Sequence, residues 1–475
     1  MSKLLMSLLF LVAYVVVIYA NPAPTNDSTD SHDAQAQAAS PTTNYISTQA
    51  YLQNPYIEMP SGGGTQNVQE SEYARDNVAQ KWFADGTWNI FGAGSYINQN
   101  GYNNYGYAAN IFGQTKQVAG FSFGGLLTIA NVFFSNDLNP SEPTNQAQGL
   151  PIEHQVTPQE LFAEYQYSNI VQVDAGWLGI SNSPWMTYYQ NDTLNMVTYQ
   201  GILANVHPGS GWLLTGFAIN GAQLPGEDGF SGQTMYNSTW NTGTSTGNIG
   251  NASNSYTYAF GANWTSPQQL VNARLWGYAF ADYANMAYAD TTIKLPINNN
   301  LGFNIGVQGA LQGQNGSSNI LNTNGYGNSV DSHMIGLQFG FNYSIFNLQL
   351  GYNNIWGNAD GYEAGGIVSP YTYQLATDPL YTTGWIQGMV ERSSGQAYKI
   401  APSLSLLDNN LTIAPAYQYY ATTLIPASSE YDLQISYNVP QIKGLTFFGG
   451  YGYLTDINND GSGIYQWQIM VTYLY

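Results

Sequence analysis

The chain ends in the stretch YQWQIMVTYLY, residues 465–475, and this stretch decides the fold class. Large apolar or aromatic side chains stand at every odd position from Tyr465 to Tyr475, and polar side chains stand at most even positions. Side chains of a β-strand alternate between two faces, so this period of two predicts a strand with one apolar and one polar face. Such a strand suits either the last strand of a soluble sandwich or the closing strand of a membrane barrel, whose outer face meets lipid.

The composition favours the barrel. Only 8% of the 475 residues are charged, against about 25% in ordinary globular proteins. The chain holds 39 Tyr, 11 Trp and 51 Gly, yet its mean hydropathy is only −0.22, which excludes a helical membrane protein. Low charge with many aromatic and small residues suits strands that face lipid on one side and water on the other.

Charge and cysteine content exclude several function classes. The formal net charge is −20 with nine basic residues, whereas nucleic-acid binders need clustered Lys and Arg. The chain has no cysteine, which excludes disulfide scaffolds, thiolate metal sites and Cys nucleophiles. The four histidines lie far apart and no hydrolase, zinc-protease or phosphate-loop motif occurs, so we predict no enzyme, catalytic residue, metal or cofactor.

The N-terminus resembles a targeting segment. Lys3 precedes an apolar run from Leu4 to Ile18, which predicts a secretory signal peptide over residues 1–20, cut after Ala20. An N-terminal membrane anchor is the alternative, although this run is shorter than the ~20 residues that a membrane-spanning helix needs. Residues 21–85 are predicted to be a flexible segment with a short helix over 67–83.

Alternation recurs through residues 86–475, which we predict to form the barrel domain. The stretches 301–311, 335–345 and 431–439 each place apolar side chains at all or nearly all odd positions and Gly, Asn, Gln or Ser at most even ones. The phase reverses between Ile345 and Phe346, as a tight hairpin requires. We predict an all-β fold, a transmembrane antiparallel β-barrel of about 16–18 strands, with 86–97 and 271–295 the most ambiguous.

A barrel needs long and short connections in alternation. The longer polar segments predict extracellular loops, and short ones such as 407–410 predict periplasmic turns. The predicted long connections are 135–160, 181–195, 220–254, 312–331 and 356–384.

Several stretches resemble the OprD-type outer-membrane porins, above all their versions in epsilon-class proteobacteria. They are AEYQYSNIVQVDAGWLGISNSPW (163–185), NDTLNMVTYQG (191–201), DPLYTTGWIQGMVERSSGQAYKIAPSL (378–404) and the close from KGLTFFGGYGYL (443–454) to Tyr475. The resemblance implies an 18-stranded barrel, monomeric or trimeric, with an inward loop that narrows the pore. It also implies a location in the outer membrane, with Tyr475 recognised by the outer-membrane assembly machinery.

The chain departs from this family at its arginines. Relatives that take up carboxylates resemble one another in a ladder of arginines along the lumen. Where that pattern has Arg-x-Pro, this chain has Leu194, Asn195, Met196 and Val197, and it contains only Arg75, Arg274 and Arg392. The departure argues against carboxylate-specific uptake.

We therefore predict a porin for passive diffusion of ions and small solutes that favours cations, because acid-rich loops create a negative potential. Strand phase and position give pore-lining candidates Glu164, Asp174, Arg392, Lys399 and Asp432, and each could equally be a solvated lumen residue without selective role. Candidates for a constricting loop are Asp137, Glu142 and Glu153. The alternative function is a structural or adhesive surface β-protein that does not transport.

Overall fold

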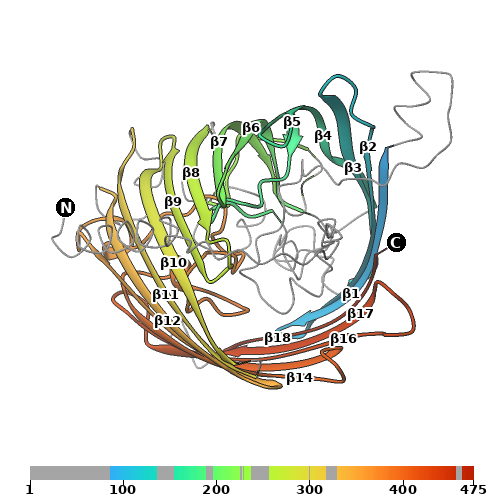
Figure 1. Cartoon of the computed structure of the whole chain (residues 1–475). Coiled ribbons are helices and arrows are strands. Elements are labelled where there is room, and N and C mark those ends of the chain that lie inside the picture. Colours follow the sequence, from blue (N-terminus) through green and yellow to red (C-terminus); the bar gives the residue numbers. More distant parts are fainter. Residues whose placement is uncertain are drawn as a thin grey trace, which may run out of the picture.

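The computed structural model describes residues 86–135, 154–188, 196–224, 227, 229–236, 256–298, 300–316, 329–455 and 463–474. Their 18 strands form one closed antiparallel sheet, drawn as a barrel in Figure 1, which confirms the predicted fold class. The strands are β1 (Thr87–Gln99), β2 (Tyr102–Gln114), β3 (Phe121–Ser135), β4 (Gln155–Tyr167), β5 (Val171–Leu178), β6 (Thr198–Gly209), β7 (Trp212–Gln223), β8 (Thr257–Thr265), β9 (Val271–Phe280), β10 (Ala284–Asn298), β11 (Leu301–Gln314), β12 (Asp331–Tyr343), β13 (Phe346–Gly357), β14 (Gly395–Leu406), β15 (Leu411–Thr422), β16 (Ser428–Asn438), β17 (Leu445–Leu454) and β18 (Ile464–Leu474). The described residues also include two 3-10 helices, η4 (Tyr362–Ala364) and η5 (Met389–Glu391).

The last strand closes the barrel. β18 pairs with β17 on one side and with β1 on the other, where Gly94 lies opposite Val471 and Gln99 opposite Gln466. Every strand therefore has two neighbours, and the sheet has no edge with unpaired backbone groups. The ambiguous stretches 86–97 and 271–295 are strands too, namely β1, β9 and β10.

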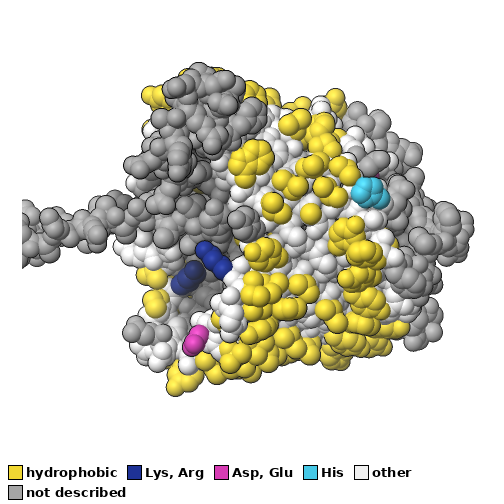
Figure 2. Space-filling view, turned by 90° about the vertical axis from the view of Figure 1, so that its right-hand side faces the viewer, with side chains coloured by type: hydrophobic (Ala, Val, Ile, Leu, Met, Phe, Trp, Pro, Cys, Tyr) yellow, Lys and Arg dark blue, Asp and Glu magenta, His cyan; other side chains and the backbone are white. Residues whose placement is uncertain are grey.

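The apolar side chains of the alternating strands face outward. In β16, Tyr431, Leu433 and Ile435 are exposed, whereas Asp432 and Ser436 on the opposite face are buried. Figure 2 shows one side of this outer wall as a broad area of hydrophobic side chains, with few charged groups in view. The outer surface therefore suits the hydrocarbon of a lipid bilayer.

The long connections lie at one end of the barrel, together with short ones such as 100–101 and 281–283, and the other end has short connections alone. Connections that follow even-numbered strands have at most six residues, and we call their side the turn end. The five predicted long connections all lie at the opposite side, the loop end, and the last of them extends to Ser394. The hairpin between β12 and β13 has a two-residue turn in which Tyr343 pairs with Phe346, which confirms the phase reversal.

The predicted signal peptide (1–20) and the segment 21–85 with its helix lie outside the described residues. Within the described ranges, no helix has both the length and the apolar character to cross a membrane.

Candidate functional site in the barrel interior

The inner wall carries amides, hydroxyls and carboxyls that hydrogen-bond across strands. Gln114 Nε2 donates to Ser122 Oγ at 3.1 Å and to Glu164 Oε1 at 3.2 Å, and Ser122 Oγ donates to the same carboxylate oxygen at 3.0 Å. These three residues come from β2, β3 and β4, which are neighbours in the sheet. These three buried polar side chains thus satisfy one another by hydrogen bonds.

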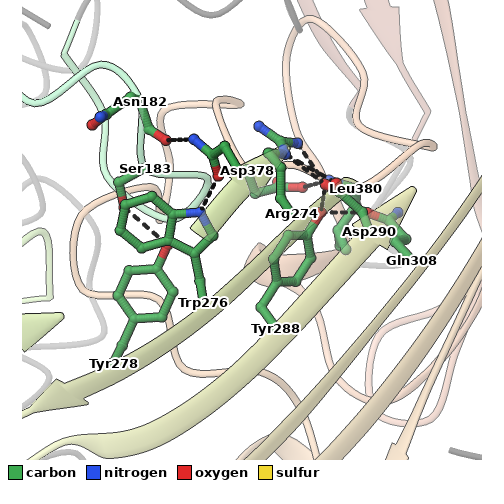
Figure 3. Close-up of polar contacts among 11 residues, drawn as sticks. Asn182, Ser183, Arg274, Trp276, Tyr278, Tyr288, Asp290, Gln308, Asp378 and Leu380 are labelled. Carbon is green, nitrogen blue, oxygen red and sulfur yellow. Dashed lines mark hydrogen bonds and ion pairs between the residues drawn. The ribbon is translucent and has the colours of Figure 1, made fainter. Parts of the chain in front are cut away.

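The connection 179–197, which we call inner loop A, places its described residues 179–188 against the inner wall of β6 to β10. Asn182 Nδ2 donates to Asn205 Oδ1 at 3.1 Å and to Thr215 Oγ1 at 2.7 Å. Ser183 Oγ lies 2.9 Å from Tyr278 Oη, as Figure 3 shows. This loop therefore covers inward-facing side chains of the wall instead of extending into solvent.

The connection 358–394, which we call inner loop B, follows the wall from β11 to β16. Val368 N donates to Gln312 Oε1 at 2.8 Å, and Gln312 Nε2 donates back to Val368 O at 2.6 Å. Further along, Thr382 N donates to Asn353 Oδ1 at 3.1 Å. Loop B is thereby fixed to the wall at several separate strands.

The inner loops also contact each other. Thr187 Oγ1 of loop A lies 2.5 Å from Thr377 Oγ1 of loop B. A third connection, between β7 and β8, joins them where Met235 N donates to Pro370 O at 2.8 Å. Three connections from the loop end therefore narrow the interior together.

An ion pair lies on the inner wall beneath loop B. Arg274 of β9 and Asp290 of β10 are direct cross-strand partners, and Nε of Arg274 donates to both carboxylate oxygens at 3.0 Å. Tyr288 Oη donates to Asp290 Oδ2 at 2.6 Å and lies next to Gln308 of β11 (Figure 3). The carboxylate thus neutralises the guanidinium and fixes its direction.

A second charged group holds loop B at β14 to β16. Glu430 accepts from Ile386 N at 2.5 Å and from Gln387 N at 3.3 Å, and Asp432 accepts from Trp385 N at 3.3 Å. Lys399 Nζ donates to Thr383 O at 2.6 Å. These wall residues bind the backbone of the loop, so they position it without needing particular loop side chains.

Loop B carries carboxyls of its own. Asp378 Oδ1 accepts from Leu380 N at 3.0 Å, and Glu391 accepts from Gln374 N and Gly388 N at 2.7 and 2.8 Å. Burial raises the pKa of Asp378, and burial together with the charge of Asp378 raises the pKa of Glu391. Burial lowers the pKa of the neighbouring Arg392.

The five pore-lining candidates lie inside the barrel, but four of them are buried. Glu164 and Asp174 are cross-strand partners that both accept from Gln172 Nε2, at 3.1 and 2.9 Å, and are at most 1% exposed. Asp432 and Lys399 are covered by inner loop B. Arg392 is 1% exposed, with its guanidinium 4.2 Å from the centroid of the Tyr420 ring. A selective role for these residues remains a prediction.

The candidates for a constricting loop, Asp137, Glu142 and Glu153, lie outside the described residues. The described inward segments are loops A and B and the part of the β7–β8 connection around Met235, and no local pattern predicts their conformation.

Sequence reasoning missed three groups that organise the interior: Glu430, the Arg274–Asp290 pair, and the inward aromatic residues of β9 and β10. A signal existed for Glu430, because it stands two residues before Asp432 and must share its face. The partner of Arg274 depends on strand pairing and register, which composition does not reveal. Among the described residues, no group of three or more His, Cys, Asp and Glu side chains is placed to hold a metal ion.

The fold matches that of solved porins from Pseudomonas. OpdK of Pseudomonas aeruginosa, solved with vanillate, is 12% identical with a TM-score of 0.64, over 83% of this chain and 99% of that chain. OprD of Pseudomonas aeruginosa is 11% identical with a TM-score of 0.63, over 83% of this chain and 96% of that one. A BenF-like porin from Pseudomonas fluorescens Pf-5 is 11% identical with a TM-score of 0.67, over 83% and 99% of the two chains.

These likenesses establish the fold, an 18-stranded barrel of the OprD type. No protein-family model and no curated protein matches the sequence.

Proposed function

We propose that this chain is an outer-membrane porin through which ions and small solutes diffuse passively, with cations favoured over anions. The observation that carries the proposal is the closed 18-stranded barrel, which shares its fold with OpdK, OprD and a BenF-like porin. An apolar outer wall and a polar inner wall suit a barrel that stands in lipid and holds water.

The cation preference rests on how the charges are distributed. The chain has 29 acidic and nine basic residues. Of the described basic residues inside the barrel, Arg274 is paired with Asp290, Arg392 is buried, and Lys399 donates to a loop carbonyl. Lys294, on the same face of β10 as Asp290, is exposed near the turn end. Lys116 and Lys443 stand in connections at the turn end. Acidic groups therefore dominate the potential at the loop end, where solutes enter in this proposal.

The same distribution argues against carboxylates as preferred solutes. The OpdK structure holds vanillate, which is a carboxylate. Both described arginines of the present chain are already engaged, by Asp290 and by Ser428 with Gln387. No described arginine ladder along the inner wall remains for an anion.

The remaining elements of the proposal concern delivery and assembly. Residues 1–20 act as a cleaved signal peptide, 21–85 as a flexible segment, and 86–475 as the barrel, with its turn end in the periplasm. The assembly machinery of the outer membrane recognises Tyr475, and the mature protein is a monomer or a homotrimer. Membership of the epsilonproteobacterial branch of the OprD-like family also stays a prediction.

A second candidate function is a structural or adhesive barrel without transport. Loops A and B favour it, because they occupy part of the interior and are bound there by many hydrogen bonds.

Conductance of the detergent-purified mature protein in a planar bilayer, with a salt gradient across it, separates the two candidates. Stepwise openings with a cation-favouring reversal potential are expected of the porin. A folded, heat-modifiable barrel that never opens would overturn the porin and support the structural candidate. Openings with an anion-favouring potential would overturn the selectivity alone.

A further inference from the structure

Inner loop B is held on the wall by two carboxyl groups whose oxygens accept hydrogen bonds from its backbone. Glu430 and Asp432 stand on the same face of β16 and accept from three consecutive loop amides, Trp385 to Gln387. The approach is close, since a Cβ added at Gly384 would lie 2.4 Å from the Glu430 carboxylate. These contacts depend on both carboxylates remaining next to the loop.

Two further carboxyls lie within the loop and flank one glycine. A Cβ added at Gly388 would lie 2.5 Å from Asp378 Oδ2 and 3.3 Å from Glu391 Oε2. Asp378 Oδ2 is buried without a hydrogen-bond partner among the described residues. Two ionised carboxylates in such a place repel each other and are poorly solvated.

The charges around the docked loop do not balance. Four carboxyls belong to this carboxyl cluster: Asp378, Glu391, Glu430 and Asp432. The cations that face it are Lys399 from β14 and Arg392 from the loop itself, and the other titratable groups against it are Tyr420 from β15 and Tyr236 from the connection after β7. Because two cations cannot neutralise four buried carboxylates, the docked arrangement favours bound protons.

We propose that inner loop B is a proton-linked gate: its docked form retains protons on the carboxyl cluster, and the loop leaves the wall as the pH rises. Its effect on flow rests on the proposed porin function, but the movement of the loop can be tested without it.

The direction follows from linkage. Burial raises the pKa of Asp378 and of Glu391 when the loop is docked, so the docked form binds more protons than the undocked form. Groups of this kind stabilise the docked form at low pH, and that stabilisation is lost as the pH rises through their raised pKa values. Acid should therefore close the gate and mild alkali should open it.

The movement is measured with a single introduced cysteine, because the chain has none of its own. Thr382 is fully buried against Asn353, so the thiol of Thr382→Cys reacts with a maleimide only when the loop undocks. Gln441→Cys, at an exposed position of a turn-end connection, corrects for the ionisation of the thiol itself. The labelling rate of Thr382→Cys, divided by that of Gln441→Cys, is expected to rise with pH up to about pH 9. For each proton that undocking releases, this ratio should rise roughly tenfold per pH unit.

A charge-removing variant tests the cause. Asp378→Asn keeps the acceptor Oδ1 and replaces only the unpartnered Oδ2, so the docked loop keeps its hydrogen bonds. In the Asp378→Asn variant, undocking should release about one proton fewer. The labelling ratio should therefore rise less steeply with pH, and its rise should begin at a higher pH. Asp360→Asn, an exposed acid of the same loop, is the matched control and should leave the profile unchanged.

The outcomes separate the gate from the pore. A labelling ratio that does not change with pH, or one that Asp378→Asn and Asp360→Asn alter equally, would overturn the gate. If Thr382→Cys fails to fold, conductance of the otherwise unchanged chain and of its Asp378→Asn variant over the same pH range decides the question. Labelling that depends on pH in a barrel that never conducts supports the gate and overturns the porin.

Discussion

Strands β9 and β18 belong to the same sheet, yet the side chains that they turn to the barrel interior differ in polarity. β18 follows the simple rule, with Tyr465, Ile469 and Tyr473 outside and with Gln466, Gln468 and Thr472 inside. β9 places large aromatic side chains inside instead: Trp276, Tyr278 and Phe280.

The cause is what lies against each inner face. Gln468 of β18 donates to Ser95 Oγ of the neighbouring strand at 2.9 Å, which keeps that part of the wall polar. Trp276 donates to Asn263 Oδ1 and stands among Phe217 and Tyr278, while Tyr278 meets Ser183 of inner loop A. Where inner loop A covers the wall at β9, the inside becomes part of a hydrophobic core. The polarity of the inward side chains therefore depends on what lies against them, whereas the period of two follows from the strand conformation.

The largest expected effect on the comparison of the two strands is the loss of the Trp276 side chain. Truncation by Trp276→Ala should lower the free energy of unfolding by about 3–5 kcal/mol, because it leaves a cavity between the wall and inner loop A. The matched control is Trp467→Ala on the outer face of β18, where the ring contacts Tyr96 at a centroid distance of 4.7 Å and lipid can fill the space. Trp467→Ala should lower the free energy of unfolding by only about 1 kcal/mol. Urea titration of barrels folded in lipid vesicles measures both, and equal losses would contradict an inner core at β9.

The next largest expected effect is the destabilisation caused by a charge on the outer face. Ile435→Arg places a guanidinium against lipid from an exposed position of β16, and should destabilise the barrel by about 2–4 kcal/mol. Gln434→Arg, one residue earlier, points inward and should cost far less. The same urea titration compares them, and a larger loss for Gln434→Arg would reverse the assignment of the two faces.

Two glycines compare a wall position that inner loop B covers with a wall position that no neighbouring atom covers. A Cβ at Gly351 would lie 2.4 Å from Tyr381 O of inner loop B, whereas one at Gly94 would meet nothing within 4 Å. Gly351→Ala should therefore destabilise the docked loop by about 1–3 kcal/mol and raise conductance, while Gly94→Ala should be nearly neutral. Heat-modifiability on a gel and planar-bilayer conductance report the two effects. A neutral Gly351→Ala would show that the loop does not press on this strand.

The smallest expected effect concerns selectivity. Exposed carboxylates ordinarily become neutral near pH 4, so the proposed cation preference should weaken between about pH 7 and pH 3 by a few-fold, which is about 1 kcal/mol or less. Reversal potentials in a fixed salt gradient measure this change. A cation preference that stays constant over this range would rule out the loop carboxylates as its source.

Local pattern was sufficient for most of the wall of the barrel, but it left 86–97 and 271–295 ambiguous, where β1, β9 and β10 lie. Side-chain alternation needs only the geometry of one strand and the difference between lipid and water, so residues 465–475 predicted their own two faces and the closure of the sheet. The same pattern predicted the phase reversal at Ile345 and Phe346, because the two strands that a two-residue turn joins must keep their apolar side chains on the same face of the sheet. It also placed Glu164, Asp174, Lys399 and Asp432 on the inner side of their strands.

Only the tertiary structure decided what fills the interior. Loops A and B have no period, and their path depends on amides and hydroxyls of distant strands, such as Asn205 and Asn353, and on the carboxylate of Glu430. Pairing of Arg274 with Asp290 depends on register across β9 and β10. Contacts of this kind join residues far apart in the chain, and their free energy comes from burial and pairing that exist only after the barrel has closed.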